Sequence, residues 1–447
     1  MYGLIASLLV ASPTITLDGR FDDWRAVEPA FALEDPAGDA RAAFDVTRVS
    51  GVVEGTTVFL DLTLTEPLNL QSGPMDEGTL VISLSLPDGR VLAIDLRGRA
   101  ATLDGVAVPW AVLRFNALPT YAATRQELRF DLGRLASPGD VVVISVSGSD
   151  DVEPVEVTLA EQHVGQAPET SLDRDGGLRL AVMNVLWDGH ADAGRGRQVS
   201  RLLAAVDADV IALQEALSRA ELPDRDEGEI PDTAAAARSV KRVLDRGLEG
   251  RWNVVADGLG CAVASRNDMQ PISLGSGVRG AAAIIDADGD GISEGDPLVV
   301  SVHLKCCGFA GSPEDDQRVA EVTALVEALR PHAQKHPIIV AGDYNLVGSR
   351  RPLDMLTDAP LRLTETLPTQ VGEDTAVTWR GLSPTESFWP GRLDLITHAS
   401  SITAKQAFVL DTADLNDATL ARHGLLASDS LASDHLLMVA DLVIPDH

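Results

Sequence analysis

Two patterns of apolar and polar residues divide the chain. From Thr14 to about Val164, short alternating or β-branched runs are separated by turn signals such as Pro87-Asp88-Gly89. Many short strands without helical periodicity predict an antiparallel β-sandwich. From Leu178 onward, short apolar runs alternate with segments of helical spacing, such as the one between Gln198 and Val206. This second pattern predicts an α/β domain whose strands are buried on both faces.

A polar segment separates the two patterns. It runs from Gln166 to Gly177 and is rich in turn formers, as is typical of a linker between domains. We therefore predict a β-sandwich domain at residues 13–165, a linker at residues 166–177 and an α/β domain at residues 178–447.

The chain starts with an apolar run, Leu4 to Val10, that ends at Ala11-Ser12-Pro13. This run matches the core and the small-residue end of a secretory signal, although the usual preceding basic residues are missing. We expect residues 1–12 to be a signal segment and the protein to be exported (periplasmic, cell-surface or secreted). The alternative is a disordered or strand-forming terminus. No other stretch approaches the about 18 apolar residues that span a bilayer, so we expect no transmembrane segment.

The composition fits a globular protein with an acidic exterior. The chain has 447 residues, 45% of them apolar, which is enough for two hydrophobic cores. It has 36 Lys and Arg residues against 67 Asp and Glu residues. Such an exterior repels polyanions, which argues against tight non-specific binding of nucleic acid through a basic face. Bound divalent cations reverse the field locally.

Polar side chains recur where the predicted strands of the second part end. These strand ends carry Asn184, Glu215, His303, Asp343 with Asn345, and Asp434 with His435, and Asp394 stands near the start of another strand. Each residue has an ordinary explanation on its own, as a turn former, a surface carboxylate or a satisfied core histidine. Their joint recurrence indicates one shared cleft.

The order and local context of these residues resemble the endonuclease/exonuclease/phosphatase superfamily. The resemblance covers about residues 178–445 and rests on six ordered motifs: Asn184 after a strand, Gln214-Glu215, His303-Leu304-Lys305, Gly342-Asp343-Tyr344-Asn345, Arg392-Leu393-Asp394 and Ser433-Asp434-His435. It implies a four-layer α/β/β/α sandwich with the site where the strand ends of two facing sheets meet. It also implies a divalent-metal-dependent hydrolase of phosphoester bonds.

The same resemblance implies a metal site. Glu215 would be the principal ligand of Mg²⁺ or Mn²⁺, with Asn184 in support, because magnesium prefers few carboxylates and keeps several waters. Asp434 would either assist these ligands or bind a second metal. Carboxylates clustered without a metal would repel each other, so we expect activity to depend on the metal.

Five further residues receive catalytic roles from the resemblance. His435 would pair with Asp394, which orients and charges the imidazole. Asp343 would activate the attacking water, and the division of this base role between Asp343 and His435 stays open. Asn345 and His303 would donate hydrogen bonds to the phosphoryl oxygens.

The first part of the chain resembles family 9-like carbohydrate-binding or DOMON-like β-sandwich modules. The resemblance rests on the run from Ile15 to Trp24, followed by Asp35, Gly38-Asp39 and Asp45. It implies that Trp24 belongs to the core and that some of the acidic residues hold a structural calcium. A carbohydrate or surface ligand and a packing or spacer role are both open.

The segment from Asp286 to Asp296 has the spacing of a calcium-binding loop. Oxygen ligands stand at the first, third, fifth and ninth positions, which are Asp286, Asp288, Asp290 and Glu294. Pro297 replaces the usual Glu at the twelfth position, and the loop joins two predicted strands instead of two helices. We predict a hairpin that binds Ca²⁺, and the alternative is a solvated acidic turn.

The three cysteines are Cys261, Cys306 and Cys307. An exported protein tends to oxidise a pair of thiols. We hypothesise that Cys261 bridges one of the other two. A vicinal bridge and three reduced thiols are the alternatives.

The expected substrate is a phosphoester, and nucleic acid, phospholipid and small phosphate esters are all open. Phosphodiesterase and phosphatase activities both fit the motifs. The acidic exterior favours a small or single phosphoester, although a metal-bridged nuclease is also compatible. The alternative from another class is a non-catalytic surface- or carbohydrate-binding protein with an inactive hydrolase-like domain, against which the complete set of motifs argues. We expect a monomer.

Overall fold

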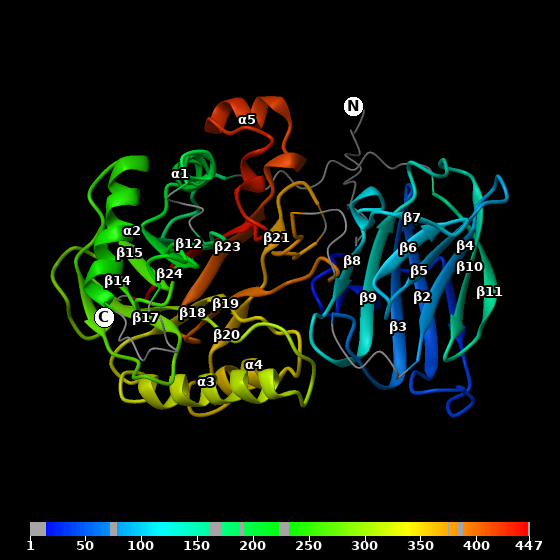
Figure 1. Ribbon diagram of the computed structural model, residues 1–447, viewed down its shortest axis with the longest axis horizontal. Coiled ribbons are helices and arrows are strands. Elements are labelled where there is room, and N and C mark those ends of the chain that lie inside the picture. Colours follow the sequence, from blue (N-terminus) through cyan, green and yellow to red (C-terminus); the bar gives the residue numbers. More distant parts are fainter. Residues whose placement is uncertain are drawn as a thin grey trace, which may run out of the picture.

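The computed structural model describes residues 15–71, 78–160, 172–187, 192–222, 232–373, 375–382 and 388–445. Figure 1 shows an all-β body from the first part of the chain beside a mixed body from the second part. The predicted signal segment, residues 1–12, lies outside the described residues, as does much of the predicted linker. Within the ranges given above, no helix is long and apolar enough to cross a membrane.

The all-β body consists of two antiparallel sheets, as the alternating pattern predicts. The first sheet has the order β1 (Phe31–Glu34), β2 (Val46–Glu54), β3 (Thr57–Leu68), β9 (Ala123–Asp131) and β8 (Asn116–Leu118). The second has the order β11 (Val152–Thr158), β10 (Val141–Gly148), β4 (Leu80–Ser85), β5 (Val91–Asp95), β6 (Ala100–Leu103) and β7 (Val106–Val108). Leu60 of the first sheet and Ile82 of the second share one buried core, so this body is a β-sandwich.

The mixed body also contains two sheets. The larger has the order β14 (Asn253–Ala256), β15 (Ala262–Ser265), β13 (Val210–Gln214), β12 (Leu178–Asn184), β24 (Leu437–Val443), β23 (Thr403–Leu410) and β21 (Thr369–Gln370). The smaller has the order β16 (Met269–Ile272), β17 (Gly280–Ile285), β18 (Leu298–His303), β19 (Ile338–Asp343), β22 (Asp394–His398) and β20 (Thr364–Thr366).

Helices cover the outer faces of both sheets (Figure 1). They are α1 (Arg195–Val206), α2 (Thr233–Gly247), α3 (Pro313–Leu329), α4 (Arg351–Thr357) and α5 (Asp417–His423). Apolar residues of α1 and α2 pack on the larger sheet, and those of α3 and α4 pack on the smaller one. A separate core lies between the two sheets. This arrangement confirms the predicted four-layer α/β/β/α sandwich.

Strand β12 shows why its central residues, Leu180 to Met183, are all apolar. Leu180 and Val182 point into the core between the sheets, whereas Ala181 and Met183 point into the core under the helices. Successive side chains of a strand alternate between its two faces, so a strand covered on both sides carries apolar residues at every position.

Strand direction brings the polar strand ends to one edge of the two sheets. β12 runs parallel to β13, and Asn184 pairs with Gln214. β18 runs parallel to β19, and His303 pairs with Asp343. β22 is antiparallel to β19, so the start of β22 lies at the same edge and Asp394 pairs with Asp343. β24 is likewise antiparallel to β12, which places His435, just before β24, at this edge. The direction of the strands thus explains why Asp394 and His435 stand at the starts of their strands, whereas Asn184, His303 and Asp343 stand at the ends of theirs.

Candidate active site

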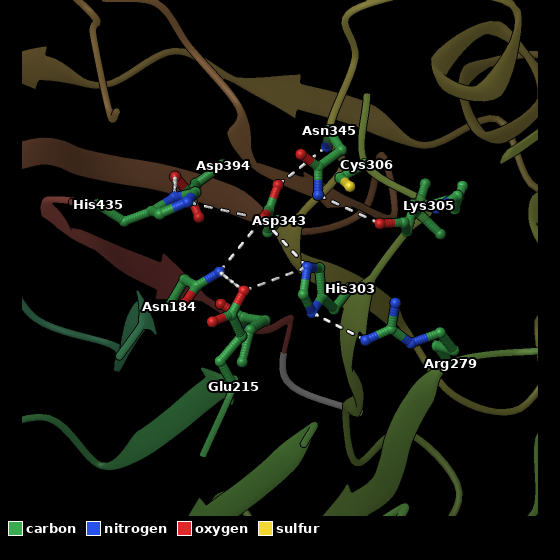
Figure 2. Close-up of polar contacts among 12 residues, drawn as sticks. Asn184, Glu215, Arg279, His303, Lys305, Cys306, Asp343, Asn345, Asp394 and His435 are labelled. Atoms are coloured by element: carbon green, nitrogen blue, oxygen red, sulfur yellow. Dashed lines mark hydrogen bonds and ion pairs between the residues drawn. The ribbon is translucent and has the colours of Figure 1, made fainter. Parts of the chain in front are cut away.

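Asp343 lies at the centre of the converging strand ends (Figure 2). Its side chain is 2% exposed. The Oδ1 atom accepts a hydrogen bond from the Asn345 backbone N–H at 2.9 Å, and Oδ2 accepts one from Nδ2 of Asn184 at 3.3 Å. Asn345 has a φ of +47°, a left-handed conformation that asparagine tolerates better than most residues. The turn after β19 therefore directs the Asp343 carboxylate toward the larger sheet.

Burial raises the pKa of Asp343 to about 7. The neighbouring Asp394 and Glu215 carboxylates also raise this pKa, while His435 and the Asn345 backbone N–H lower it. A carboxylate with a pKa near neutrality accepts a proton more readily than an ordinary aspartate does.

His435 and Asp394 form a buried pair beside Asp343. The two are joined by a contact of 2.7 Å between His435 Nδ1 and Asp394 Oδ2, and His435 Nε2 lies 3.7 Å from Asp343 Oδ2. Burial alone would lower the pKa of His435, but the Asp394 and Asp343 carboxylates outweigh it and raise this pKa to about 10. This shift favours the positively charged imidazole at neutral pH.

His303 differs from His435 because an arginine, not a carboxylate, contacts its Nδ1 atom. The Arg279 guanidinium donates to Nδ1 at 3.3 Å, which leaves the proton of a neutral imidazole on Nε2. Burial, Arg279 and His435 together hold the pKa of His303 well below its usual value. Its Nε2 atom lies 3.5 Å from Asp343 Oδ2. His303 thus presents a neutral N–H donor to the centre of the site.

Glu215 follows β13 with a φ of +52°. Its Oε1 atom accepts a hydrogen bond from Asn184 Nδ2 at 3.3 Å. The other oxygen, Oε2, is buried and has no hydrogen-bond partner in the described part of the chain. Burial raises the pKa of Glu215, and the Asp434 carboxylate adds to this effect. A buried carboxylate oxygen without a partner is unfavourable unless a ligand satisfies it.

Asp434 lines the same cavity but already has partners. Its Oδ2 accepts a hydrogen bond from Nε1 of Trp379 at 3.2 Å, and its Oδ1 accepts one from Ser433 Oγ at 3.3 Å. The structure therefore brings Asn184, Glu215, His303, Asp343, Asn345, Asp394 and His435 together as one cluster, with Asp434 at its edge.

The sequence model of the Endonuclease/Exonuclease/phosphatase family matches residues 181–435, more than half of the chain. The protein belongs to this family. Members of the endonuclease/exonuclease/phosphatase family are hydrolases that act on phosphoesters and usually use divalent metals. A search of curated proteins found no match.

Several solved structures are similar to part of this chain. An endonuclease/exonuclease/phosphatase from Bacteroides vulgatus is 14% identical, covers 60% of this chain and 99% of its own, and gives a TM-score of 0.41. TDP2 from D. rerio, complexed with single strand DNA product, is 15% identical, covers 60% of this chain and 99% of its own, and gives a TM-score of 0.40. A mannosyl-6-phosphatase from Bacteroides thetaiotaomicron is 16% identical, covers 60% of this chain and 100% of its own, and gives a TM-score of 0.38.

The residues at this family member's site fit a divalent cation. Glu215 offers the unpartnered Oε2 atom. Asn184, which is 1% exposed, donates through Nδ2 to the other oxygen, Oε1, and its Oδ1 atom accepts a hydrogen bond from the Leu186 backbone N–H at 3.0 Å, which leaves one lone pair of that oxygen for a cation. Carboxylate and amide oxygens are the ligands that Mg²⁺ and Mn²⁺ prefer. Glu215 would hold the ion with support from Asn184, and the role of Asp434, in assisting these ligands or binding a second metal, stays a prediction.

The predicted calcium hairpin joins β17 and β18, which are antiparallel neighbours. The carboxylates of Asp286, Asp288 and Asp296 approach within 4.8 Å of one another. Glu294, predicted at the ninth position, instead forms an ion pair with Lys335 at 2.6 Å. The cluster of the described residues therefore contains Asp296 and lacks two members of the predicted ligand set, Asp290 and Glu294. Ca²⁺ binding here stays a prediction.

The sandwich domain confirms the core role of Trp24, which is 9% exposed. Its Nε1 atom donates to Glu127 Oε2 at 3.0 Å. Of the acidic residues in the resemblance, Asp35 and Asp39 form a carboxylate cluster with Asp150. Asp45 instead accepts a hydrogen bond from the Gly38 backbone N–H. Both a structural calcium and a carbohydrate ligand of this domain stay predictions.

The predicted bridge between Cys261 and one of the other cysteines is wrong, because all three thiols are free. Cys261 is buried and contacts the backbone oxygen of Arg279 at 3.7 Å. Cys306 and Cys307 lie side by side and line the cavity, with their Sγ atoms 2.7 Å apart. Cys306 and Cys307 lie together because they are adjacent in the sequence, and not because the fold brings distant segments together.

Arg279 is a site residue that no sequence motif indicates. We expect Arg279→Met to lower kcat/KM for a phosphoester substrate by about tenfold, because Nδ1 of His303 loses the donor that fixes its tautomer. The ¹⁵N chemical shifts of His303 should change from one tautomer to a mixture. Arg330→Met, which removes an exposed arginine paired with Glu327 on α3, is the control. Unchanged histidine shifts would contradict the assignment.

Proposed function

We propose that the protein is a divalent-metal-dependent phosphodiesterase or phosphatase. The observation that carries this proposal is the buried Asp343 carboxylate, which lies within 3.7 Å of Asn184, His303 and His435 side-chain nitrogens. Hydrolysis of a phosphoester requires a base for water, donors for the phosphoryl oxygens and positive charge. The cluster supports each of these requirements.

Asp343 is the group best placed to accept a proton from the attacking water. It is buried, it has a pKa near neutrality, and its Oδ1 atom is held by the Asn345 backbone. His435 carries a positive charge that Asp394 stabilises, so it suits the stabilisation of phosphoryl charge better than the base role. The geometry therefore favours Asp343 as the base.

His303 and Asn345 complete the donor set. The Nε2–H of a neutral His303 is not used by Arg279 and lies 3.5 Å from Asp343 Oδ2, so a phosphoryl oxygen placed beside Asp343 can accept it. Asn345 donates one amide hydrogen to the Leu304 backbone oxygen at 3.2 Å, and an amide nitrogen has a second hydrogen to donate. A divalent cation held by Glu215 and Asn184 would supply further positive charge toward the phosphoryl oxygens when bound.

The test uses bis-p-nitrophenyl phosphate, p-nitrophenyl phosphate, plasmid DNA and sphingomyelin, each with Mg²⁺, Mn²⁺ or Ca²⁺. We expect hydrolysis of at least one substrate with Mg²⁺ or Mn²⁺, its loss in excess chelator, and its return when the metal is restored. Glu215→Ala should raise the metal concentration for half-maximal rate by about tenfold or more, because it removes the charged ligand.

Glu327→Ala on the exposed face of α3 is the matched control and should leave the metal dependence unchanged. Hydrolysis that persists in excess chelator would overturn the metal assignment. The absence of hydrolysis with every substrate and metal would favour the non-catalytic alternative.

A further inference from the structure

Both domains line the cavity that contains the catalytic cluster. The cavity has a volume of about 180 Å³, and one side of it is formed by polar residues such as Asp343 and His435. Trp379, Phe388 and Leu393 form an apolar side, and Gln71 of the sandwich domain also lines the cavity. The sandwich domain is therefore part of the wall of this site.

Gln71 is a buried side chain with one unsatisfied atom. It is 2% exposed, and its Nε2 atom donates to the Trp389 backbone oxygen at 2.8 Å. This contact fixes the orientation of the amide, since the reversed orientation would bring two acceptors together. The remaining oxygen, Oε1, is buried and has no hydrogen-bond partner in the described ranges. A buried acceptor without a partner is unfavourable, and a hydrogen-bond donor from a bound ligand would satisfy it.

The surroundings of Gln71 are fixed by contacts between the domains. Its backbone N–H donates to Asn69 Oδ1 at 3.0 Å, and Asn69 in turn donates to the Val347 backbone oxygen. A Cβ atom on Gly391 would lie 2.4 Å from the Thr120 side chain and 2.9 Å from Gln71 Nε2. Glycine at position 391 therefore leaves the room that the Gln71 amide occupies.

The apolar side of the cavity is also preformed. The rings of Trp379 and Phe388 meet edge to face, with centroids 6.3 Å apart. The hydrogen bond from Trp379 Nε1 to Asp434 fixes the indole beside the catalytic cluster. The guanidinium of Arg99, from the sandwich domain, lies 5.7 Å from the Phe388 ring centre.

We propose that Gln71 is a substrate-binding residue contributed by the sandwich domain. Its Oε1 atom accepts a hydrogen bond from a hydroxyl or N–H donor on the organic group of the phosphoester, and the apolar face of that group packs against Trp379 and Phe388. The cavity is smaller than the about 300 Å³ at the lower end of ordinary ligand sites, so the organic group is compact. A single sugar combines these features, and a nucleoside shares the same chemistry. This inference rests on the proposed phosphoesterase function.

The test compares Gln71→Leu with the unaltered protein on three substrates. Glucose 6-phosphate and AMP carry hydrogen-bond donors, whereas bis-p-nitrophenyl phosphate carries none. We expect kcat/KM to fall about tenfold for the donor-bearing substrate that the protein accepts and to change less than about twofold for the donor-free one. A lower kcat/KM for glucose 6-phosphate would identify a sugar as the group that donates to Gln71, and a lower kcat/KM for AMP would identify a nucleoside.

Gln198→Leu is the matched control, because Gln198 also donates its amide to a backbone oxygen, that of Ser428, but lies outside the cavity. Equal losses on all three substrates would show a merely structural role and overturn the inference. Hydrolysis of bis-p-nitrophenyl phosphate without hydrolysis of glucose 6-phosphate or AMP would also overturn it. If bis-p-nitrophenyl phosphate, p-nitrophenyl phosphate, glucose 6-phosphate and AMP are all left intact with every metal, the proposed function is what fails.

A second measurement needs no variant. Deoxy analogues of the accepted substrate, each lacking one hydroxyl, are compared with the parent compound on the unaltered protein. We expect one analogue to lose about tenfold in kcat/KM, because Gln71 Oε1 then stays unpaired in the complex. Equal rates for every analogue would overturn the inference, even if Gln71→Leu fails to fold.

Discussion

Asp343→Asn is expected to lower kcat for phosphoester hydrolysis by about 10³-fold while the protein stays folded. The amide has nearly the same shape as the carboxylate and keeps an oxygen that can accept the Asn345 backbone N–H. It has no site that can take a proton from water at neutral pH. Burial disfavours the Asp343 charge most, and Asp394 and Glu215 repel it, so its removal offsets the lost attraction to His435 and the melting temperature should change little.

Asp131→Asn in the sandwich domain is the control for this variant. Asp131 makes a similar local contact, since its Oδ1 atom accepts a hydrogen bond from the Gly133 backbone N–H at 2.9 Å, but it lies outside the cavity. Circular dichroism and thermal melts establish folding, and stopped assays with the accepted substrate give kcat. A folded Asp343→Asn variant that keeps more than about a tenth of kcat would remove Asp343 from the base role.

The sequence could predict the cluster because each member stands next to an apolar strand. Short apolar runs such as Ile338 to Ala341 indicate strands buried on both faces, and such strands deliver their end residues to one edge of a sheet. The position of Asp394 at the start of its strand follows equally from the antiparallel pairing of β22 with β19. These are local patterns, so they can be read without knowing how distant segments pack.

The roles of Arg279, Gln71 and Trp389 depend on contacts between distant segments. Arg279 precedes β17 and reaches His303 only because β17 pairs with β18. Gln71 and Trp389 meet across the boundary between two domains, 318 positions apart in the chain. Neither periodicity nor spacing encodes how two folded domains dock.

The predicted bridge between Cys261 and Cys306 or Cys307 is absent for a physical reason. Cys261 and the pair Cys306-Cys307 belong to the same domain, which made a bridge plausible from the sequence. In the structure the Cys261 thiol is buried and faces the Arg279 backbone oxygen. A disulfide needs two close Cα atoms whose side chains point toward each other, and membership of one domain does not ensure this.

Trp389→Ala is expected to lower the free energy of unfolding by about 3–5 kcal/mol, the usual range for removing a large buried aromatic side chain. Trp389 lies between β21 and β22 of the catalytic domain in sequence, yet it is 1% exposed in the core of the sandwich domain. Its ring centre lies 4.3 Å from that of Phe115, and its Nε1 atom donates to the Leu96 backbone oxygen at 3.1 Å. Chemical denaturation with tryptophan fluorescence and circular dichroism measures the loss.

The same variant should also lower kcat/KM for donor-bearing and donor-free substrates alike. Trp389 anchors the segment that leads through Leu393 to Asp394, the partner of His435, so a loosened anchor affects the catalytic pair as well as Gln71. This uniform loss distinguishes Trp389→Ala from the substrate-selective loss expected for Gln71→Leu.

Trp110→Ala is the control for the anchoring role of Trp389. Trp110 is partly buried against the same sandwich core but does not line the cavity. Its substitution should destabilise the protein less and leave kcat/KM unchanged. If Trp389→Ala destabilises the sandwich and the folded protein keeps its full kcat/KM, the catalytic segment holds its position without the sandwich domain. A lower free energy of unfolding together with a lower kcat/KM in Trp389→Ala, but not in Trp110→Ala, would instead show that the sandwich domain positions the active site. Both variants remove a tryptophan from the same core, so a difference between them reports the position of Trp389.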